Sequence, residues 1–427
     1  MIDLRRLRSD PEGTRALLAR RLDGALDALL DDLLALDARR RQVLARVETL
    51  KAERNKASDE VARRKRTQEP ADDLMATLRL SGDDVRALDV ELRDIESALE
   101  RQALEVPNLP LPDVPDGDAT ANAVVRTWGT PPTLDFTPRP HWELGERLGI
   151  LDLARGAKLS GSGFPVFVGL GARLVRALEN FMLDLHTREH GYVEVVPPLL
   201  INRASLQGTG QLPKFEEELY AVERDALYLL PTAEVPVTNL HRDEILDAAS
   251  LPLAYVACTP CFRREAGAHG RDTRGLIRVH QFDKVELVRI VRPDDGPAEH
   301  QRITGHAETV LQRLGLPYRV LALAAGDTGF ASACTYDLEV WAAGVGTWLE
   351  VSSASTFTDF QARRANIRFR PEPGAKPEFA YTLNASGLAF PRTIIALLEN
   401  GQQPDGSIRI PEALAPYLGT DRLVPRA

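Results

Sequence analysis

The segment from Thr259 to Leu287 combines residue types that recognise a nucleotide. Arg263 and Arg264 precede a stretch rich in Gly and Arg, and Arg, His, Phe, Lys and Glu then alternate from residue 278 to residue 286. An alternation with a period of two places these side chains on one face of a β-strand. Guanidinium groups bind phosphate oxygens, an aromatic ring can stack on a purine, and a carboxylate can hold an ammonium. The segment therefore predicts a nucleotide site that also has a place for an amine.

Four short motifs follow one another through the C-terminal two thirds of the chain. They are Pro231–Glu234, the hairpin from Phe262 to Glu286, Phe360–Arg364, and the stretch Asn384–Arg392. With these motifs the chain resembles the seryl-tRNA synthetases of the common bacterial type, which are class II aminoacyl-tRNA synthetases, over nearly its whole length. The joint occurrence in this order carries the resemblance, because each residue alone is more often part of a core, a helix cap or a surface.

The resemblance implies a two-step reaction. The serine carboxylate would attack the α-phosphorus of ATP to give seryl-adenylate, and the seryl group would then pass to the 3′ end of tRNA(Ser), with tRNA(Sec) as a second candidate acceptor. The resemblance also implies Mg²⁺ held by Glu350 and Ser353, and a homodimer formed through residues 191–198. Positioning and charge neutralisation suffice for such a phosphoryl transfer, so we expect no general base.

The resemblance also implies a role for each residue of the motifs. Arg263, Arg392 and Glu350 would be the catalytic residues, with Arg263 on the α-phosphate and Arg392 reaching the γ-phosphate. Glu265 would take the adenine amino group and Phe282 would stack on the ring, while Glu286 would bind the serine ammonium. The full expected sets are Arg263, Arg264, Glu265, Val279, Phe282, Glu350, Val351, Ser352, Ser353 and Arg392 for ATP, and Thr232, Ala233, Glu234, Glu286, Asn384 and Ser386 for serine, the last two at its hydroxyl.

Some positions depart from the family pattern, and other functions stay open. Gly401, Cys334, Ala354 and Cys258 stand where the family more often has other residues, next to the expected ligands. One alternative is a paralogue that loads serine onto a carrier protein or a biosynthetic amine. Another is a non-catalytic coiled-coil binding protein, which the retention of the arginines and Glu286 disfavours.

Two metal-like motifs carry less weight. His186–His190 matches the zinc-protease spacing H-x-x-E-H, but Gly191 indicates that a helix ends there, and no third ligand is distinguishable. Cys258–Cys261 matches C-x-x-C, yet Cys334 alone cannot complete a structural zinc site. We therefore expect no zinc, and we interpret the cysteines as ordinary buried residues.

The first hundred residues predict a helical arm. Apolar residues recur in steps of three and four from Leu29 to Val61 and again from Val85 to Leu99, as in a coiled-coil seam. The polar segment Thr67–Asp73, broken by a proline, separates the two series, so we expect an antiparallel hairpin. In the first helix of this hairpin, residues 39–66 carry eleven Lys and Arg against four acids. In the second helix, residues 71–101 carry nine acids against four bases. Opposite charges favour the pairing of the two helices.

The sequence allows two interpretations of the arm's function. It could be a dimerisation or spacer element, or it could follow the phosphate backbone of an RNA. The candidate RNA-binding residues are Arg39, Arg40, Arg46, Lys51 and Arg54, and the resemblance supports this second reading.

The remaining chain predicts an α+β fold. Residues 106–140 are rich in Pro, which is typical of a linker, and from residue 141 short β-like runs alternate with helical stretches at 172–188, 297–314 and 391–400. The sequence contains neither G-x-G-x-x-G nor G-x-x-x-x-G-K-[ST], so a Rossmann or P-loop fold has no support. We predict an N-terminal domain at 1–105 with the antiparallel coiled-coil arm, a linker at 106–140, and a catalytic domain at 141–427 built on a mainly antiparallel β-sheet flanked by helices.

Length and composition agree with these expectations. A chain of 427 residues exceeds the size of one compact core, and no apolar run is long enough for a membrane span. The first residues lack the apolar region of a signal peptide and only three cysteines occur, so we expect a cytoplasmic protein with no membrane partner. The net charge of −9 disfavours RNA binding as an average, but it hides the basic strand of the arm.

Overall fold

A computed structural model describes residues 1–266 and 274–425 of the chain. The chain divides into two compact units. One comprises Met1, Arg20–Leu22 and the chain from Asn108 onward, and the other comprises Ile2–Ala19 and Asp23–Pro107. The long helices belong to the second unit and the large sheet belongs to the first.

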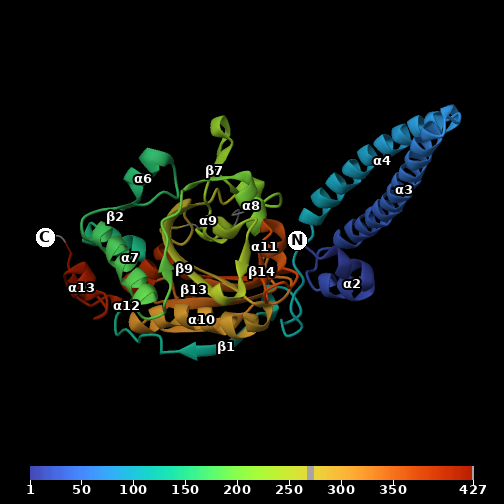
Figure 1. Ribbon diagram of the computed structural model, residues 1–427. Helices are drawn as coiled ribbons and strands as arrows, with labels where there is room; N and C mark the ends of the chain where they lie inside the picture. The colour runs from blue at the N-terminus through green and yellow to red at the C-terminus, as the bar shows by residue number, and fades with distance from the viewer. Residues whose placement is uncertain (267–273, 426–427) are drawn as a thin grey trace. The chain divides into compact units, whose positions relative to one another are not determined.

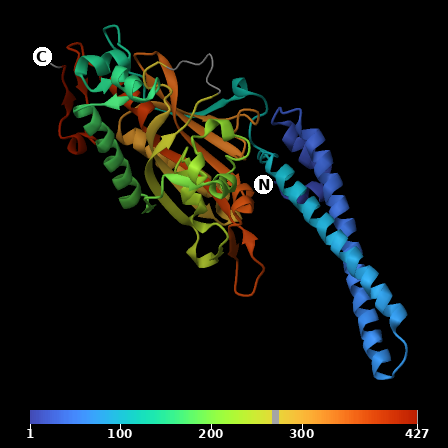
Figure 2. The same ribbon diagram turned by 90° about the horizontal axis from the view of Figure 1, so that it is seen from above.

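The arm is a pair of long helices. After the short helices α1 (Leu4–Ser9) and α2 (Pro11–Ala19), α3 runs from Leu26 to Arg66 and α4 from Asp72 to Leu104. The two helices lie side by side (Figure 2), which confirms the predicted helical hairpin. Their shared seam buries apolar side chains from both helices: Leu26, Leu30, Leu33, Val43, Val47 and Val61 from α3, and Val85, Ile95, Leu99 and Ala103 from α4.

The start of the seam differs from the sequence prediction. Leu29 was expected in the seam but is only half-buried, whereas Leu26 and Leu30 are buried. Asp37 interrupts the apolar seam and is also buried. Ion pairs with Arg8 and Arg41 compensate its charge, because a buried carboxylate without a partner would be costly.

Ion pairs across the hairpin show that the helices run antiparallel. Arg39 donates to Glu91 over 2.8 Å, Arg40 donates to Glu96 over 2.9 Å, and Lys51 lies 3.4 Å from Asp89. From Arg40 to Lys51 and on to Arg64 along α3, the partners run backwards along α4, from Glu96 to Asp89 and Asp73, as an antiparallel pair requires. The predicted attraction between the basic and the acidic helix is therefore confirmed.

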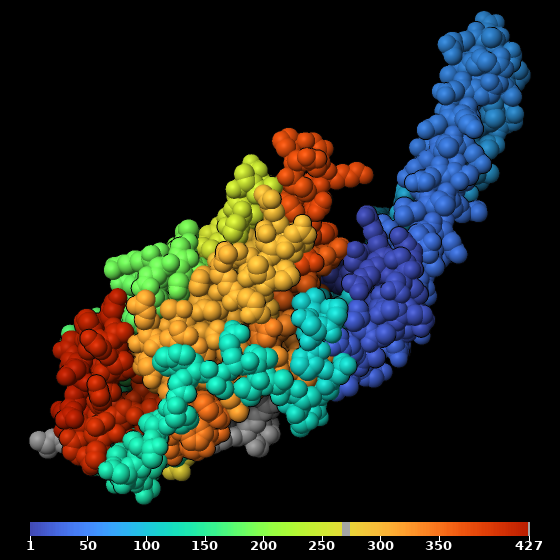
Figure 3. All heavy atoms as spheres, turned by 90° about the horizontal axis from the view of Figure 1, so that it is seen from below, coloured from blue at the N-terminus to red at the C-terminus, as the bar shows by residue number. Residues whose placement is uncertain are grey.

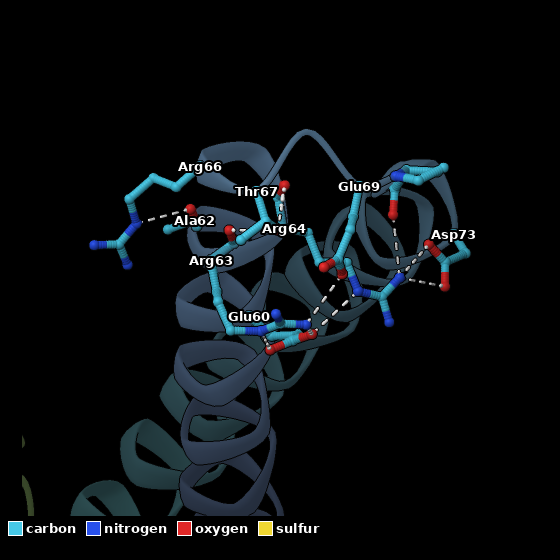
Figure 4. A network of polar contacts seen from close by, with 9 residues as sticks. Glu60, Ala62, Arg63, Arg64, Arg66, Thr67, Glu69 and Asp73 are labelled. Atoms are coloured by element: carbon cyan, nitrogen blue, oxygen red, sulfur yellow. Dashed lines mark hydrogen bonds and ion pairs between the residues drawn. The ribbon is translucent and has the colours of Figure 1, made fainter.

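The tip of the arm is closed by a compact ionic cluster (Figure 4). Arg63 binds both carboxylate oxygens of Glu60 at 2.8 Å and also contacts Glu69. Arg64 bridges Glu60 and Asp73 at 3.1 and 3.2 Å, so it joins the end of α3 to the start of α4. The two guanidinium groups lower the pKa of Glu60 to about 2.

The core of the first unit is an eight-stranded sheet (Figure 1). Its strands, in spatial order, are β1 (Ala123–Trp128), β11 (Tyr318–Ala322), β12 (Cys334–Ala342), β13 (Thr347–Thr358), β16 (Tyr381–Ala389), β10 (Gln281–Val291), β9 (Leu253–Phe262) and β4 (Val193–Glu194). Every neighbouring pair is antiparallel except β4 with β9. The predicted α+β fold with a mainly antiparallel sheet is confirmed.

Helices cover the sheet. Helix α10 (Gly296–Arg313) runs along one face, and α9 (Glu234–Thr238) lies on the opposite side, as Figure 1 shows. The predicted helices near 172–188, 297–314 and 391–400 are α7 (Leu170–Arg188), α10 and α12 (Phe390–Gly401). Among the described helices, none is both long and apolar enough to cross a membrane.

Shorter elements complete this unit. The remaining α-helices are α5 (His141–Leu148), α6 (Leu153–Ser160), α8 (Arg203–Thr209), α11 (Phe360–Ala365) and α13 (Ala415–Leu418). Four small sheets join β2 (Leu151–Asp152) to β3 (Val166–Phe167), β5 (Leu200–Asn202) to β7 (Leu227–Leu229) and β6 (Ala221–Val222), β14 (Arg368–Arg370) to β15 (Glu378–Phe379) and β8 (Ile245–Asp247), and β17 (Ile408–Arg409) to β18 (Arg422–Leu423).

Two segments depart from the sequence prediction. The alternating residues 278–286 were expected on one strand, but β10 begins only at Gln281, so Arg278 and His280 precede the strand. The Pro-rich segment 106–140 was expected to be a linker, yet Ala123–Trp128 within it forms β1 and pairs with β11. Figure 3 shows this part of the chain, in teal, running across the surface.

Candidate active site

The large sheet carries a cavity of about 710 Å³. Twelve of the expected ligand residues line it: Thr232, Glu234, Arg263, Glu265, Val279, Phe282, Glu350, Val351, Ser353, Asn384, Ser386 and Arg392. They come from the ends of β9 and β10, from β13 and β16, and from the first turns of α9 and α12. One cavity therefore brings together the residues expected for the nucleotide and those expected for the amino acid.

Four expected residues lie outside the described lining of the cavity. Glu286 is buried directly behind it and contacts Thr232 and Asn384, which do line it. Ser352 is buried, and its hydroxyl donates to the carbonyl of Ser386 over 2.6 Å. Ala233 and Arg264 are the other two expected residues outside the lining. Residues 267–273 of the Gly- and Arg-rich loop lie outside the described residues.

Buried carboxylates form one end of the cavity. Asn384 Nδ2 donates to Glu286 Oε1 over 3.0 Å and to Glu234 Oε2 over 3.1 Å. The register of the sheet causes this approach, because Glu286 on β10 is paired with Ser386 on β16, two residues beyond Asn384. From the loop before α9, Thr232 donates to Glu286 Oε2 over 3.2 Å. Two buried acids thus share one amide at the end of the cavity.

Burial shifts the protonation of Glu234. Desolvation first, and then the neighbouring charge of Glu286, raise the pKa of Glu234 to about 7. Gln361 opposes this rise by donating to Glu234 Oε1 over 2.6 Å, and Gln361 itself accepts a hydrogen bond from Thr382. Glu234 can therefore gain or lose a proton near neutral pH.

Asn384 also presents an unused acceptor. Its Oδ1 atom is buried, and it has no hydrogen-bond partner in the part of the chain that the structure describes. Because Nδ2 faces two carboxylates, the hydrogen-bond network fixes the orientation of the amide. A buried acceptor without a donor costs about 1–3 kcal/mol, so a donor from a ligand would be favourable here.

Arginines form the other end of the cavity. The Arg263 guanidinium lies 5.3 Å from the centre of the Phe282 ring, and its Nε donates to the carbonyl of Pro231. Arg392 donates to the backbone carbonyls of Ile277 and Glu350 over 3.1 and 2.8 Å. These bonds leave the planar guanidinium of each arginine held at the cavity wall, where it can meet phosphate oxygens.

The expected metal ligands lie beside these arginines. Glu350 and Ser353 are three residues apart on β13, and the Glu350 carboxylate lies 3.4 Å from Arg392. Asp337 on β12 is paired with Ser353, and its buried Oδ1 has no partner among the described residues. Burial and the nearby Glu350 raise the pKa of Asp337. Carboxylate and hydroxyl oxygens of this kind suit a hard divalent cation.

Comparisons with known proteins agree with this geometry. The model of the seryl-tRNA synthetase N-terminal domain matches residues 1–110, and the model of the tRNA synthetase class II core domain (G, H, P, S and T) matches residues 215–401. The serine–tRNA ligase of Gemmatimonas aurantiaca is 59% identical over 98% of this chain and 99% of its own length. The chain belongs to the seryl-tRNA synthetase family. It is therefore an enzyme, an ATP-dependent ligase of class II, as predicted.

Other relatives and solved structures extend the comparison. The serine–tRNA ligase of Carboxydothermus hydrogenoformans is 53% identical over 99% of both chains. The seryl-tRNA synthetase of Pyrococcus horikoshii, solved in complex with ATP, superposes with a TM-score of 0.96 at 38% identity over all of both chains. The cytoplasmic serine–tRNA ligase of Naegleria fowleri, in complex with AMP, gives a TM-score of 0.87 at 29% identity over 98% of this chain and 96% of its own.

Several charged and polar residues at this synthetase cavity were not among the expected ligands. Lys284, Arg278 and Asp337 line it, and Gln361 supports Glu234 from behind. Arg278 forms an ion pair with Glu265, the residue expected to take the adenine amino group. Arg278 and Lys284 belong to the alternating pattern at 278–286, so that pattern was the available signal.

The metal-like motifs take ordinary structural roles. His186 and His190 hydrogen-bond to each other through their Nδ1 atoms over 2.9 Å, and His190 stacks on His306 at 4.0 Å. Burial lowers the pKa of His186 to about 3, so this ring is neutral at physiological pH. Cys258 and Cys261 are free thiols, and burial raises the pKa of both.

Replacing Glu234 by Gln should change how stability depends on pH. The unfolded carboxyl ionises near pH 4.5 and the folded one near pH 7, so the wild-type protein loses stability as pH rises between these values. Relative to Glu234→Gln, this loss should reach about 3 kcal/mol at most between pH 5 and pH 8. Denaturant unfolding at both pH values measures it. The exposed Glu217→Gln serves as the control, and a pH dependence identical in all three proteins would contradict the shift.

Proposed function

We propose that this synthetase activates L-serine with ATP to seryl-adenylate and transfers the seryl group to the 3′ end of tRNA(Ser). The observation that carries the proposal is the cavity with arginines at one end and paired carboxylates at the other. A zwitterionic amino acid joined to a nucleotide has the complementary charges. The names of the relatives and the ATP and AMP complexes of the solved structures support the same reaction.

The charges along the cavity suit attack of a carboxylate on ATP. A serine carboxylate oxygen bonds to the α-phosphorus while the bond to the bridging oxygen breaks, and pyrophosphate leaves with the electron pair. Arg263 lies where it can neutralise the α-phosphate while Phe282 beside it stacks on adenine, and Arg392 can reach the γ-phosphate. Positioning and charge neutralisation account for most of the catalysis in such transfers.

Serine fits the carboxylate end. Its ammonium would lie between the carboxylates of Glu286 and Glu234. Burial and neighbouring groups hold both carboxylates in place. Its hydroxyl would donate to the buried Oδ1 of Asn384, which has no partner in the described chain, with Ser386 beside it. An amino acid without the hydroxyl would leave this acceptor unpaired, which is a large penalty in a closed site.

Magnesium fits the opposite end. Glu350 and Ser353 supply oxygen ligands on one strand, and Asp337 adds a carboxylate oxygen across the strand pair. No group of three or more His, Cys, Asp or Glu side chains that could hold a metal occurs in the described residues. Mg²⁺ commonly uses only one or two carboxylates together with substrate phosphates. When bound, it would neutralise charge on the phosphates of ATP.

The proposed activity should appear as ATP–pyrophosphate exchange that depends on L-serine and Mg²⁺. Glu286→Gln removes the carboxylate that would hold the ammonium, so exchange should fall by about a hundredfold or more, and Glu217→Gln should exchange as the wild type does. Alanine, glycine and threonine should support little exchange. Absence of exchange with serine in the folded wild-type protein would contradict the proposal. Charging of tRNA(Ser) and tRNA(Sec) transcripts then separates a tRNA ligase from a paralogue that loads serine elsewhere.

We also propose that the basic face of α3 binds the tRNA. The structure distinguishes two groups among the expected residues. Arg39, Arg40 and Lys51 form ion pairs with acids of α4, whereas Arg46 and Arg54 have no acidic partner within ion-pair distance among the described residues. The paired group holds the hairpin together, so the second group is the better source of phosphate contacts.

This division predicts different effects on tRNA binding. Arg46→Gln with Arg54→Gln should weaken binding and lower the slope of log K against log salt by roughly two. Arg40→Gln with Glu96→Gln leaves the net charge unchanged and removes a paired cation, so it should alter the slope little. Filter binding of tRNA(Ser) over a range of salt measures both, and equal slopes for all three proteins would contradict the assignment. Serine-dependent exchange should stay intact in both variants.

A second copy of the chain is the proposed partner of the exposed segment 191–198 with β5. Val193 and Val196 expose 60% and 86% of their surface, and Leu200 exposes 44%. Apolar side chains gathered on one exposed segment are typical of an interface. Val196→Asp should shift the protein toward monomer in sedimentation velocity, whereas Val424→Asp, exposed by 60% near the C-terminus, should not. A monomeric wild-type protein would contradict the dimer.

A further inference from the structure

Lys284 is a buried cation at the carboxylate end of the cavity. Its side chain is 6% exposed, and its Nζ forms an ion pair with Oε2 of the fully buried Glu286. The same ammonium donates to Thr232 Oγ1 over 2.8 Å. Lys284 therefore contacts two of the residues proposed to bind serine. A lysine is rarely buried unless its charge is compensated.

The charged groups around Lys284 come from four directions. Glu286 lies two residues along β10, Glu234 begins α9, and Arg263 follows β9, which also presents the thiol of Cys261. Asn384 of β16 and Gln361 of α11 contribute neutral amides. Of the two cations, Lys284 forms an ion pair with one of these carboxylates, whereas Arg263 donates to the carbonyl of Pro231. A substrate ammonium can therefore still pair with the second carboxylate.

We propose that Lys284 is a positioning residue for the amino acid, whose ammonium orients Glu286 and Thr232 and balances one of the two buried carboxylates so that the site accepts one substrate ammonium. The proposal rests on the proposed function, because it assigns Lys284 to the serine end of the same cavity. Thr232 relays the effect: its hydroxyl accepts from Lys284 and from the N–H of Glu234, and donates to Glu286.

Removal of the ammonium has a consequence for proton uptake. Lys284 is one of the groups that lower the pKa of Glu234, against the larger effects of desolvation and Glu286. Without Lys284 the pKa of Glu234 should therefore rise above about 7. Because ionised Glu234 is needed to receive an ammonium, capture of serine should require a higher pH. A lysine that served folding alone would not have this effect.

The same strand contains an internal control. Arg289 is also buried on β10, and its ion pair with Glu299 is 2.6 Å long. The pair lies outside the described lining of the cavity. Replacing Arg289 removes a cation that is as buried as Lys284 and lies on the same strand. It therefore reproduces the loss of folding stability without changing the charge beside Glu234.

The test measures kcat/KM for serine in ATP–pyrophosphate exchange from pH 5.5 to 8.5, since this ratio reports the free enzyme. The wild-type ratio should rise with pH through about 7. Lys284→Met should move the rise to higher pH and raise KM for serine about tenfold or more, with KM for ATP within about twofold of the wild type. Lys284→Arg keeps the charge and should keep the pH at which the rise occurs, as should Arg289→Met.

Each outcome decides a separate question. A Lys284→Met profile that coincides with the wild-type profile, or an equal rise in KM for serine and ATP, would overturn the positioning role. If thermal melting shows that Lys284→Met is unfolded, Lys284→Gln makes the same comparison with a neutral donor to Thr232. A wild-type protein without serine-dependent exchange would instead contradict the proposed function.

Discussion

The balance of buried charge at one end of the cavity is the constraint on which the site depends. Glu286 and Glu234 are both buried, with 1% and 6% of their surface exposed, and they share the amide of Asn384. Two such carboxylates repel each other, and burial favours the neutral form of Glu234. The protein meets this cost with Lys284 and with hydrogen bonds from neutral amides. This compensation is incomplete, and the negative charge that remains attracts a substrate ammonium.

The antiparallel sheet gives this balance its geometry. Neighbouring strands β12, β13, β16 and β10 each place side chains toward the same cavity, so residues far apart in the sequence meet at fixed spacings. The short helix α9 begins with Glu234, and α12 brings Arg392 to the opposite end. A rigid sheet therefore separates the region for the ammonium from the region for the phosphates, which is the arrangement that in-line transfer requires. The arm, which we propose to bind the tRNA, is crossed by ion pairs between α3 and α4.

The sequence predicted the elements whose signals are local. The coiled-coil periodicity gave the hairpin, and the ordered motifs gave the family and the residues of the cavity. The edge strand β1 was missed, because all six of its residues are exposed and the Pro-rich segments on both sides are typical of a linker. The role of Lys284 was also missed: the alternating pattern places it two residues from Glu286, but only the fold brings Thr232, 52 residues away in the sequence, to its ammonium. Pairing between Arg39 and Glu91 was likewise invisible, because it depends on the register of two helices rather than on either helix alone.

The central claim is that one cavity holds the amino acid and the nucleotide with opposite charges at its two ends. A crystal structure with a non-hydrolysable sulfamoyl analogue of seryl-adenylate tests it most directly. The ammonium should lie within hydrogen-bond distance of Glu286 and Glu234, the hydroxyl should donate to Asn384 Oδ1, and the adenine should lie against Phe282. An analogue bound elsewhere, or bound with its ammonium toward Arg263, would contradict it.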